Sequence, residues 1–240
     1  MKKIRVAFIY GESNVFLTGT YFDNTYYNFF IKALNRNKQV IVSNFPTKRS
    51  FDTSILKNDF DVILLWSNSK LGMPEELENI RNLDIPVVAR AADPFDVKKS
   101  IKLHKKWKID YYFHFLDKSF FYELYPPHFK YKTIIFGVEP SLYELVTPFN
   151  ERIKNRILNS GAVGNTRFFS RIINTIKNPK WNALRCYYLR TKCNELPYVD
   201  YTSTLNHTFV NDRYSILLQK YAGAIAANRQ SARPRYRVFL

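Results

Sequence analysis

Cysteine is scarce in this chain, and its pattern argues against two kinds of protein. Cys186 and Cys193 are the only two cysteines among 240 residues, and no histidine cluster surrounds them. A structural zinc site needs four ligands at tighter spacings, and a small secreted scaffold carries more cysteines. We therefore expect both side chains to be reduced thiols in a cytosolic protein, and we expect no metal site.

Long apolar runs are absent as well. The first apolar run, residues 4–10, is broken at once by Gly11 and Glu12, so it is too short for a signal peptide. No run approaches the ~20 residues that a membrane span requires. These absences predict a soluble, cytoplasmic protein, with at most peripheral contact at the inner face of a membrane.

Acidic residues are few compared with basic ones, and the imbalance is uneven along the chain. The sequence holds 37 Lys and Arg against 20 Asp and Glu, which gives a net charge of +17. Residues 1–150 contribute +5 and residues 151–240 contribute +12. Such a field predicts attraction to an acidic partner, whether nucleic acid, anionic lipid or a phosphorylated substrate. The lysine-rich residues 98–108 fit a solvated helix face that could also attract anionic lipid.

The first part of the chain alternates apolar, strand-like runs with helical patterns. The expected strands are residues 4–10, 40–45 (ended by Pro46), 61–67, 86–92, 111–116 and 132–138. The expected helices are residues 23–34, 73–83, 98–108 and 117–124. This alternation is typical of a parallel sheet covered on both faces, so we expect an α/β, Rossmann-like domain over residues 1–140. Its ligands should gather at the carboxyl ends of the strands.

Several candidate residues for an acceptor site lie at those carboxyl ends. Gly11, Glu12 and Ser13 follow the first strand, where they either contact an acceptor or merely turn the chain. Asp93 follows the fourth strand, where it acts as a catalytic general base or only opens a loop. His114 falls within the fifth strand, where a histidine is either packed in the core or in contact with the acceptor.

After a polar, proline-containing linker over residues 141–154, the pattern restarts over residues 155–240. A short strand at residues 157–158 leads through a loop to an amphipathic helix. Five apolar residues recur there at spacings of three and four, which predicts one buried face: Phe168, Phe169, Ile172, Ile173 and Ile176. The remaining expectations are strands at residues 183–189 and 222–227, irregular structure at residues 194–211, and a helix beginning near Asp212. We expect a second Rossmann-like domain that is incomplete.

The loop before the amphipathic helix is the best candidate for an anion site. It holds Ser160, Gly161 and Gly164, and Arg167 and Arg171 lie four residues apart after it. The first amides of a helix lack hydrogen-bond partners, and the aligned peptide dipoles add partial positive charge there. Two nearby arginines favour a phosphate or diphosphate over a carboxylate. The plainer alternative is a strand, turn and helix with a solvated basic face.

Four segments, taken in chain order after the first domain, carry a resemblance to a known family. They are Phe-Gly-Val-Glu-Pro-Ser-Leu-Tyr at residues 136–143, the Ser160-Gly161 loop, the arginine-bearing helix after it, and the run from Tyr-Ser-Ile-Leu-Leu to Ala-Ala at residues 214–227. Together with the Rossmann-like first domain, they resemble the two-domain GT-B glycosyltransferases, nearest the spore-maturation-type family.

The resemblance implies transfer of a sugar from a UDP- or GDP-type nucleotide-sugar donor to a glycan, lipid-linked or protein acceptor, without a tightly bound cofactor. The acceptor then lies against the first domain and the donor against the second. By position, Gly161 lies close to the donor's phosphates, and Arg171, with Arg167, neutralises the diphosphate leaving group as a catalytic residue.

This sequence departs from the family in one respect and leaves another class of function open. In such enzymes an acidic stretch further along holds the donor's ribose, and this sequence ends before any counterpart. The resemblance therefore implies a truncated second domain, in either an enzyme or an inactive fragment of one. Alternatively, arginines beside aromatic residues, as at Arg185, Tyr187, Tyr188 and Arg190, suit a non-enzymatic binder of nucleic acid or another polyanion.

Overall fold

The computed structural model describes residues 2–11, 26–66, 74–92, 97–134, 146–160, 163, 167–177, 187–201 and 214–225. Contacts within the chain divide it into two compact units, Met1–Glu139 and Pro140–Leu240.

The first unit alternates strands with helices, as its apolar pattern predicted. In chain order its elements are β1 (Ile4–Gly11), α2 (Tyr26–Arg36), β2 (Val40–Thr47), β3 (Ser50–Asp52), η1 (Thr53–Leu56), β4 (Val62–Leu65), β5 (Glu76–Glu78), η2 (Ile80–Asn82), β6 (Val87–Arg90), α3 (Val97–Lys106), β7 (Tyr111–His114), α4 (Lys118–Leu124) and β8 (Lys130–Thr133).

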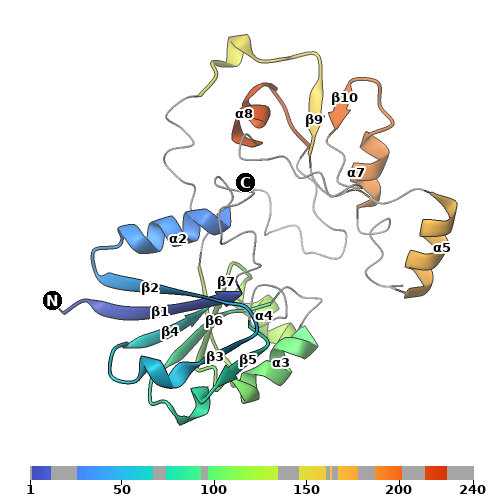
Figure 1. Ribbon diagram of the computed structural model, residues 1–240. Helices are drawn as coiled ribbons and strands as arrows, with labels where there is room; N and C mark the ends of the chain where they lie inside the picture. The colour runs from blue at the N-terminus through green and yellow to red at the C-terminus, as the bar shows by residue number, and fades with distance from the viewer. Residues whose placement is uncertain are drawn as a thin grey trace. The chain divides into compact units, whose positions relative to one another are not determined.

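Six of these strands form one parallel sheet in the order β2-β1-β4-β6-β7-β8 (Figure 1). The expected parallel α/β sheet is therefore confirmed. The chain enters the sheet at β1, places β2 on one side, and then returns to place β4, β6, β7 and β8 on the other. In a sheet of this kind the reversal leaves a crevice at the carboxyl ends of β1 and β4, where ligands bind.

Side chains alternate between the two faces of this sheet, and each face has its own apolar core. Ala7, Ile9 and Leu65 belong to the larger core, together with residues of η1, η2, α3 and α4. Phe8 and Trp66 belong to the smaller core on the opposite face, where Phe30 and Leu34 of α2 pack against them. Figure 1 shows α2 along this side of the sheet. The central strands are therefore covered on both sides, which is why their sequences are almost continuously apolar.

Two predictions for the first unit are wrong in detail. Residues 73–83 were expected to be helical, but β5 pairs there with β3 in a small parallel sheet, and Asn79 takes a left-handed conformation (φ 59°) that breaks any helix. Burial of Leu77 and Ile80 outweighs the local helical preference. Pro46 was expected to end a strand, yet β2 continues to Thr47, because β2 is an edge strand and can do without one amide donor.

The second unit is built around one short strand with parallel neighbours on both sides. Its described elements are η4 (Phe149–Glu151), β9 (Ile157–Asn159), α5 (Phe168–Lys177), α7 (Tyr188–Cys193), β10 (Val199–Tyr201) and α8 (Tyr214–Gln219). β10 pairs with β9 in parallel. On the other side of β9, Leu158 forms a parallel bridge with Ala224, with hydrogen bonds from the Leu158 amide to the Gly223 carbonyl (3.1 Å) and from the Ile225 amide to the Leu158 carbonyl (2.8 Å).

The order of chain segments around β9 therefore repeats the start of the first unit. β9 comes first, β10 lies on one side, and the later segment around Ala224 lies on the other. The same relation holds among β1, β2 and β4. Of the strand expected at residues 222–227, the structure describes residues 222–225, which form this single bridge and no longer strand.

Three predictions for the second unit are wrong. The apolar face of α5 was expected to be buried, but Phe168, Phe169 and Ile176 are 69%, 76% and 76% exposed. Tyr188 and Leu189 were expected in a strand, but they begin α7. Residues 194–211 were expected to be irregular, but β10 forms there, because its backbone completes a ladder with β9. Local periodicity gave no sign of that pairing partner.

Candidate functional site

The carboxyl end of β1 lies at the chain reversal of the first sheet. Gly11 is its last residue, is buried, and pairs with Thr47 at the end of β2. The Thr47 hydroxyl donates to the Tyr10 carbonyl (3.2 Å), which fixes the two strand ends together. Gly11 thus lies at the position expected of a ligand-facing residue, whereas the predicted contacts Glu12 and Ser13 fall outside the described residues.

Arg90 is a buried cation at the carboxyl end of β6 and was not among the candidate residues predicted from the sequence. It is 7% exposed, and its guanidinium carbon lies 5.4 Å from the centroid of the Trp66 ring. Phe30 of α2 packs against the same ring, with centroids 5.0 Å apart. A guanidinium over an indole face gains a cation–π attraction that strengthens away from water. The sequence held one sign of this role: Arg90 is a charged residue at the end of the apolar run that begins at Pro86.

His114 ends the neighbouring strand β7 but is a core residue. Its side chain is 1% exposed, and its ring centroid lies 4.1 Å from that of Phe115. Its backbone carbonyl accepts hydrogen bonds from the Tyr131 hydroxyl (3.1 Å) and the Ile134 amide (2.9 Å). Of the two alternatives left open by the sequence, this geometry favours the packed histidine over an acceptor contact.

Asp93 itself lies outside the described residues, but the chain that leads to it is firmly held. Ala91 and Ala92 are buried after β6. The Tyr125 hydroxyl of the α4 C-cap lies 3.2 Å from the Ala92 carbonyl and 3.1 Å from the Ser100 hydroxyl of α3. The segment that carries Asp93 therefore starts from a fixed point at the carboxyl edge of the sheet.

In the second unit, the carboxyl end of β9 is anchored by Asn159. This residue is 1% exposed, and its amide nitrogen donates to the Arg190 carbonyl (2.8 Å) and to the side-chain oxygen of Asn194. The two bonds tie the end of β9 to the last turn of α7. Ser160, the first residue of the candidate anion loop, follows directly, whereas Gly161 and Gly164 lie outside the described residues.

α5 begins where the sequence placed the second half of the anion site. The Arg171 amide donates to the Arg167 carbonyl (3.0 Å), so Arg167 stands at the helix start and Arg171 one turn further on. Both side chains are exposed. The predicted strand and the arginine-bearing helix that follows it in the chain are confirmed. The hydrogen bond that Lys192 of α7 donates to Glu195 raises the pKa of Lys192, and the nearby charge of Arg171 opposes this shift, so Arg171 lies within electrostatic reach of α7.

A polar network crosses the three segments of this small sheet. Arg156, just before β9, donates through Nε to Asp200 of β10 (2.8 Å), and Tyr221 donates its hydroxyl to the other carboxylate oxygen (2.9 Å). Hydrogen bonds from Arg156 and then from Tyr221 lower the pKa of Asp200. The network joins one residue from each segment, so it specifies the parallel order around β9. None of these three residues was among the candidate site residues predicted from the sequence.

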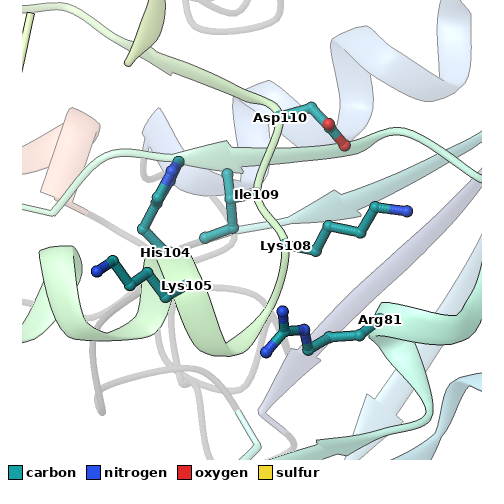
Figure 2. Close-up of a pocket in the computed structure, with 6 residues that line it drawn as sticks. All are labelled: Arg81, His104, Lys105, Lys108, Ile109 and Asp110. Atoms are coloured by element: carbon teal, nitrogen blue, oxygen red, sulfur yellow. The ribbon is translucent and has the colours of Figure 1, made fainter. Parts of the chain in front are cut away.

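The first unit also holds a cavity of about 320 Å³, lined by Arg81, His104, Lys105, Lys108, Ile109 and Asp110. It lies by the amino end of β7, away from the carboxyl ends of the strands. Its charged groups do not converge, because Lys105 and Lys108 point in opposite directions (Figure 2). Lys108 donates to the Leu83 carbonyl (3.0 Å), and Asp110 accepts from the Val87 amide (2.8 Å). These bonds give both groups structural roles.

Comparisons of the chain with protein-family models, with curated proteins and with solved structures gave no match. Among the described residues, no cluster of three or more His, Cys, Asp or Glu side chains is suited to hold a metal ion. Within the same part of the chain, every helix is too short or too polar to cross a membrane.

Proposed function

We propose that this protein is a glycosyltransferase that moves a sugar from a UDP- or GDP-type nucleotide-sugar donor to a glycan, lipid-linked or protein acceptor. In this proposal the chain is built from two Rossmann-like lobes of GT-B type. The second lobe binds the donor, and the first binds the acceptor.

One observation carries the proposal: β9 has β10 on one side and the Ala224 segment on the other, so the chain reverses at β9. Ligands of parallel α/β sheets bind at the carboxyl edge beside such a reversal. Ser160 follows β9 at that edge, and the helix after it starts with Arg167 and carries Arg171 one turn later. Helix amides and guanidinium groups are suited to a diphosphate.

The chemistry requires few protein groups. An acceptor hydroxyl attacks the anomeric carbon of the donor sugar, the bond from that carbon to the diphosphate oxygen breaks, and the nucleoside diphosphate leaves with the electron pair. The hydroxyl proton passes to a base, for which Asp93 remains the candidate. Negative charge develops on the departing diphosphate, and Arg171 and Arg167 stabilise it as fixed cations. No tightly bound cofactor takes part.

Thermal unfolding with and without UDP or GDP tests the proposal. A nucleoside diphosphate that binds the folded state raises the melting temperature. We expect such a rise for the natural sequence, its loss in Arg171→Ala, and its retention in Lys220→Ala. Lys220 is a matched control because it is an exposed cation of the same unit that precedes the Ala224 segment, at the opposite edge of the sheet. No stabilisation by either nucleotide contradicts the proposal.

A second candidate function is binding of nucleic acid or another polyanion without catalysis. The charge of +12 over residues 151–240 favours it, as does the Arg190 guanidinium, 5.8 Å from the Tyr187 ring centroid. Affinity that falls steeply with salt and is indifferent to nucleotide-sugar identity supports this candidate. Binding that requires a nucleoside diphosphate supports the glycosyltransferase.

A further inference from the structure

α5 carries five large apolar side chains that the protein leaves in contact with water. Phe168, Phe169 and Ile176 are 69%, 76% and 76% exposed, and Ile172 and Ile173 are 43% and 50% exposed. Scattered exposed apolar residues are ordinary, but five on one ten-residue helix form a continuous patch. An exposed apolar patch of this kind marks a surface that binds a partner with an apolar face or an apolar interior.

The five side chains lie on one side of the helix. At about 100° per residue they occupy an arc of roughly 140°. Ser170, Arg171 and Thr175 lie outside this arc, and the Thr175 hydroxyl donates back to the Arg171 carbonyl (2.7 Å). α5 is therefore amphipathic, with its large apolar side chains on one face.

The surroundings of α5 are cationic. Arg167 and Arg171 are exposed at its start, and the charge of Arg171 acts on Lys192 of the neighbouring α7. Residues 151–240 contribute +12 of the net charge of +17. An apolar face bordered by arginines in a strongly basic unit is the composition of helices that lie in the interface of an anionic bilayer.

We propose that α5 docks this protein onto membranes that contain anionic lipid. The ten-residue helix is about 15 Å long, so it lies in the plane of the membrane surface. Its phenylalanine and isoleucine side chains enter the boundary between head groups and acyl chains, and the net positive charge of residues 151–240 attracts the lipid phosphates. The apolar face of α5 inserts into the bilayer, and the positive charge of the unit makes binding to anionic lipid stronger than binding to neutral lipid.

This proposal assigns membrane contact to α5 and not to the lysine-rich helix α3. The exposed residues of α3 include Lys98, Lys102 and Lys105, and its buried residues are Val97 and Ser100. α3 therefore has charge but no exposed apolar face to insert. Electrostatic attraction without insertion is largely screened at high salt.

Co-sedimentation with lipid vesicles tests the proposal on the full chain. One set contains phosphatidylcholine alone, and the other contains equal parts of phosphatidylcholine and phosphatidylglycerol. We expect binding to the anionic vesicles only, and a loss of at least about tenfold in the double variant Phe169→Ser, Ile176→Ser, because each methylene group withdrawn from the interface weakens partitioning roughly fourfold. The matched control Ile55→Ser, Ile216→Ser removes two exposed apolar side chains elsewhere and should bind as the natural sequence does.

Four results overturn the proposal. The first is equal binding to both vesicle types, and the second is full binding by the α5 variant. The third is that the double variant Lys98→Gln, Lys102→Gln loses binding while the α5 variant keeps it. The fourth is that the chain does not bind vesicles but associates with itself, and that the α5 variant abolishes this association. The last result would assign the face to a second copy of the chain. Circular dichroism verifies that each variant folds, and a retained rise in melting temperature with UDP or GDP separates membrane docking from the donor site.

Discussion

Asn159 anchors the carboxyl end of β9, directly before the candidate donor loop. Its side chain is 1% exposed and donates hydrogen bonds to the Arg190 carbonyl and the Asn194 side chain. Asn159→Ala removes both bonds and leaves the Arg190 carbonyl without this donor. A neutral hydrogen bond contributes about 0.5–1.5 kcal/mol net, so we expect the free energy of opening at the end of β9 to fall by about 1–3 kcal/mol.

Amide hydrogen exchange measured by mass spectrometry resolves this effect within the chain. A loss of about 1–3 kcal/mol corresponds to exchange roughly 5- to 150-fold faster, because about 1.4 kcal/mol is tenfold in an equilibrium constant. The acceleration should appear in peptides that contain β9 and α7 and should be absent from peptides of β1. The rise in melting temperature with UDP or GDP should shrink as well, because Ser160 loses its fixed support.

The control is Asn82→Ala, which truncates an exposed asparagine of the first unit and should leave exchange in β9 unchanged. If exchange in β9 and α7 changes by less than twofold in Asn159→Ala, the two hydrogen bonds do not hold the carboxyl end of β9. Asn159 would then not support the candidate donor loop.

Three further predictions concern the first unit. Phe121→Ala should lower its free energy of unfolding by about 3–5 kcal/mol in urea titrations, because the buried ring stacks on Tyr131 with centroids 3.8 Å apart. Burial, with the charge of His128, lowers the pKa of His104 in the folded protein. The free energy of unfolding should therefore decrease as the pH falls below about 6.5, the pKa of histidine in the unfolded chain. Urea titrations at several pH values should show that His104→Gln removes this pH dependence. Hydrogen bonds from the backbone and then the side chain of Arg5 lower the pKa of Asp61, so their contribution should be present above about pH 3.9 and lost as the pH falls through the folded-state pKa. In acid titrations, Asp61→Asn should lose stability less steeply with falling pH than the natural sequence does.

The parallel sheet of the first unit could be predicted because its strands are buried on both faces. Residues 4–10 and 86–92 are therefore almost continuously apolar, and Gly11 and Pro86 mark their limits. Residues 73–83 could not be predicted, because their helical spacing competes with pairing to β3, a contact between segments far apart in the sequence. Periodicity reports which side chains share a face, but not which partner covers it.

The same limit applies to the candidate site. The spacing of Arg167 and Arg171 was visible in the sequence, and the helix that carries them is confirmed. The exposure of Ile176 was not visible, since amphipathic spacing looks the same whether the apolar face meets a sheet or a different partner. Arg90 and Asn159 acquire their roles only from strand register and packing, which no local pattern encodes. Asp93, Gly161, Gly164, Glu12 and Ser13 remain predictions.

The central claim is that the carboxyl end of β9 binds a nucleoside diphosphate, and hydrogen exchange in the presence of saturating UDP or GDP tests it most directly. We predict slower exchange in peptides that span residues 157–171, with no change in peptides of α8 (Tyr214–Gln219), and loss of the protection in Arg171→Ala. Unchanged exchange over residues 157–171 with both nucleotides, or protection confined to the first unit, would contradict the claim.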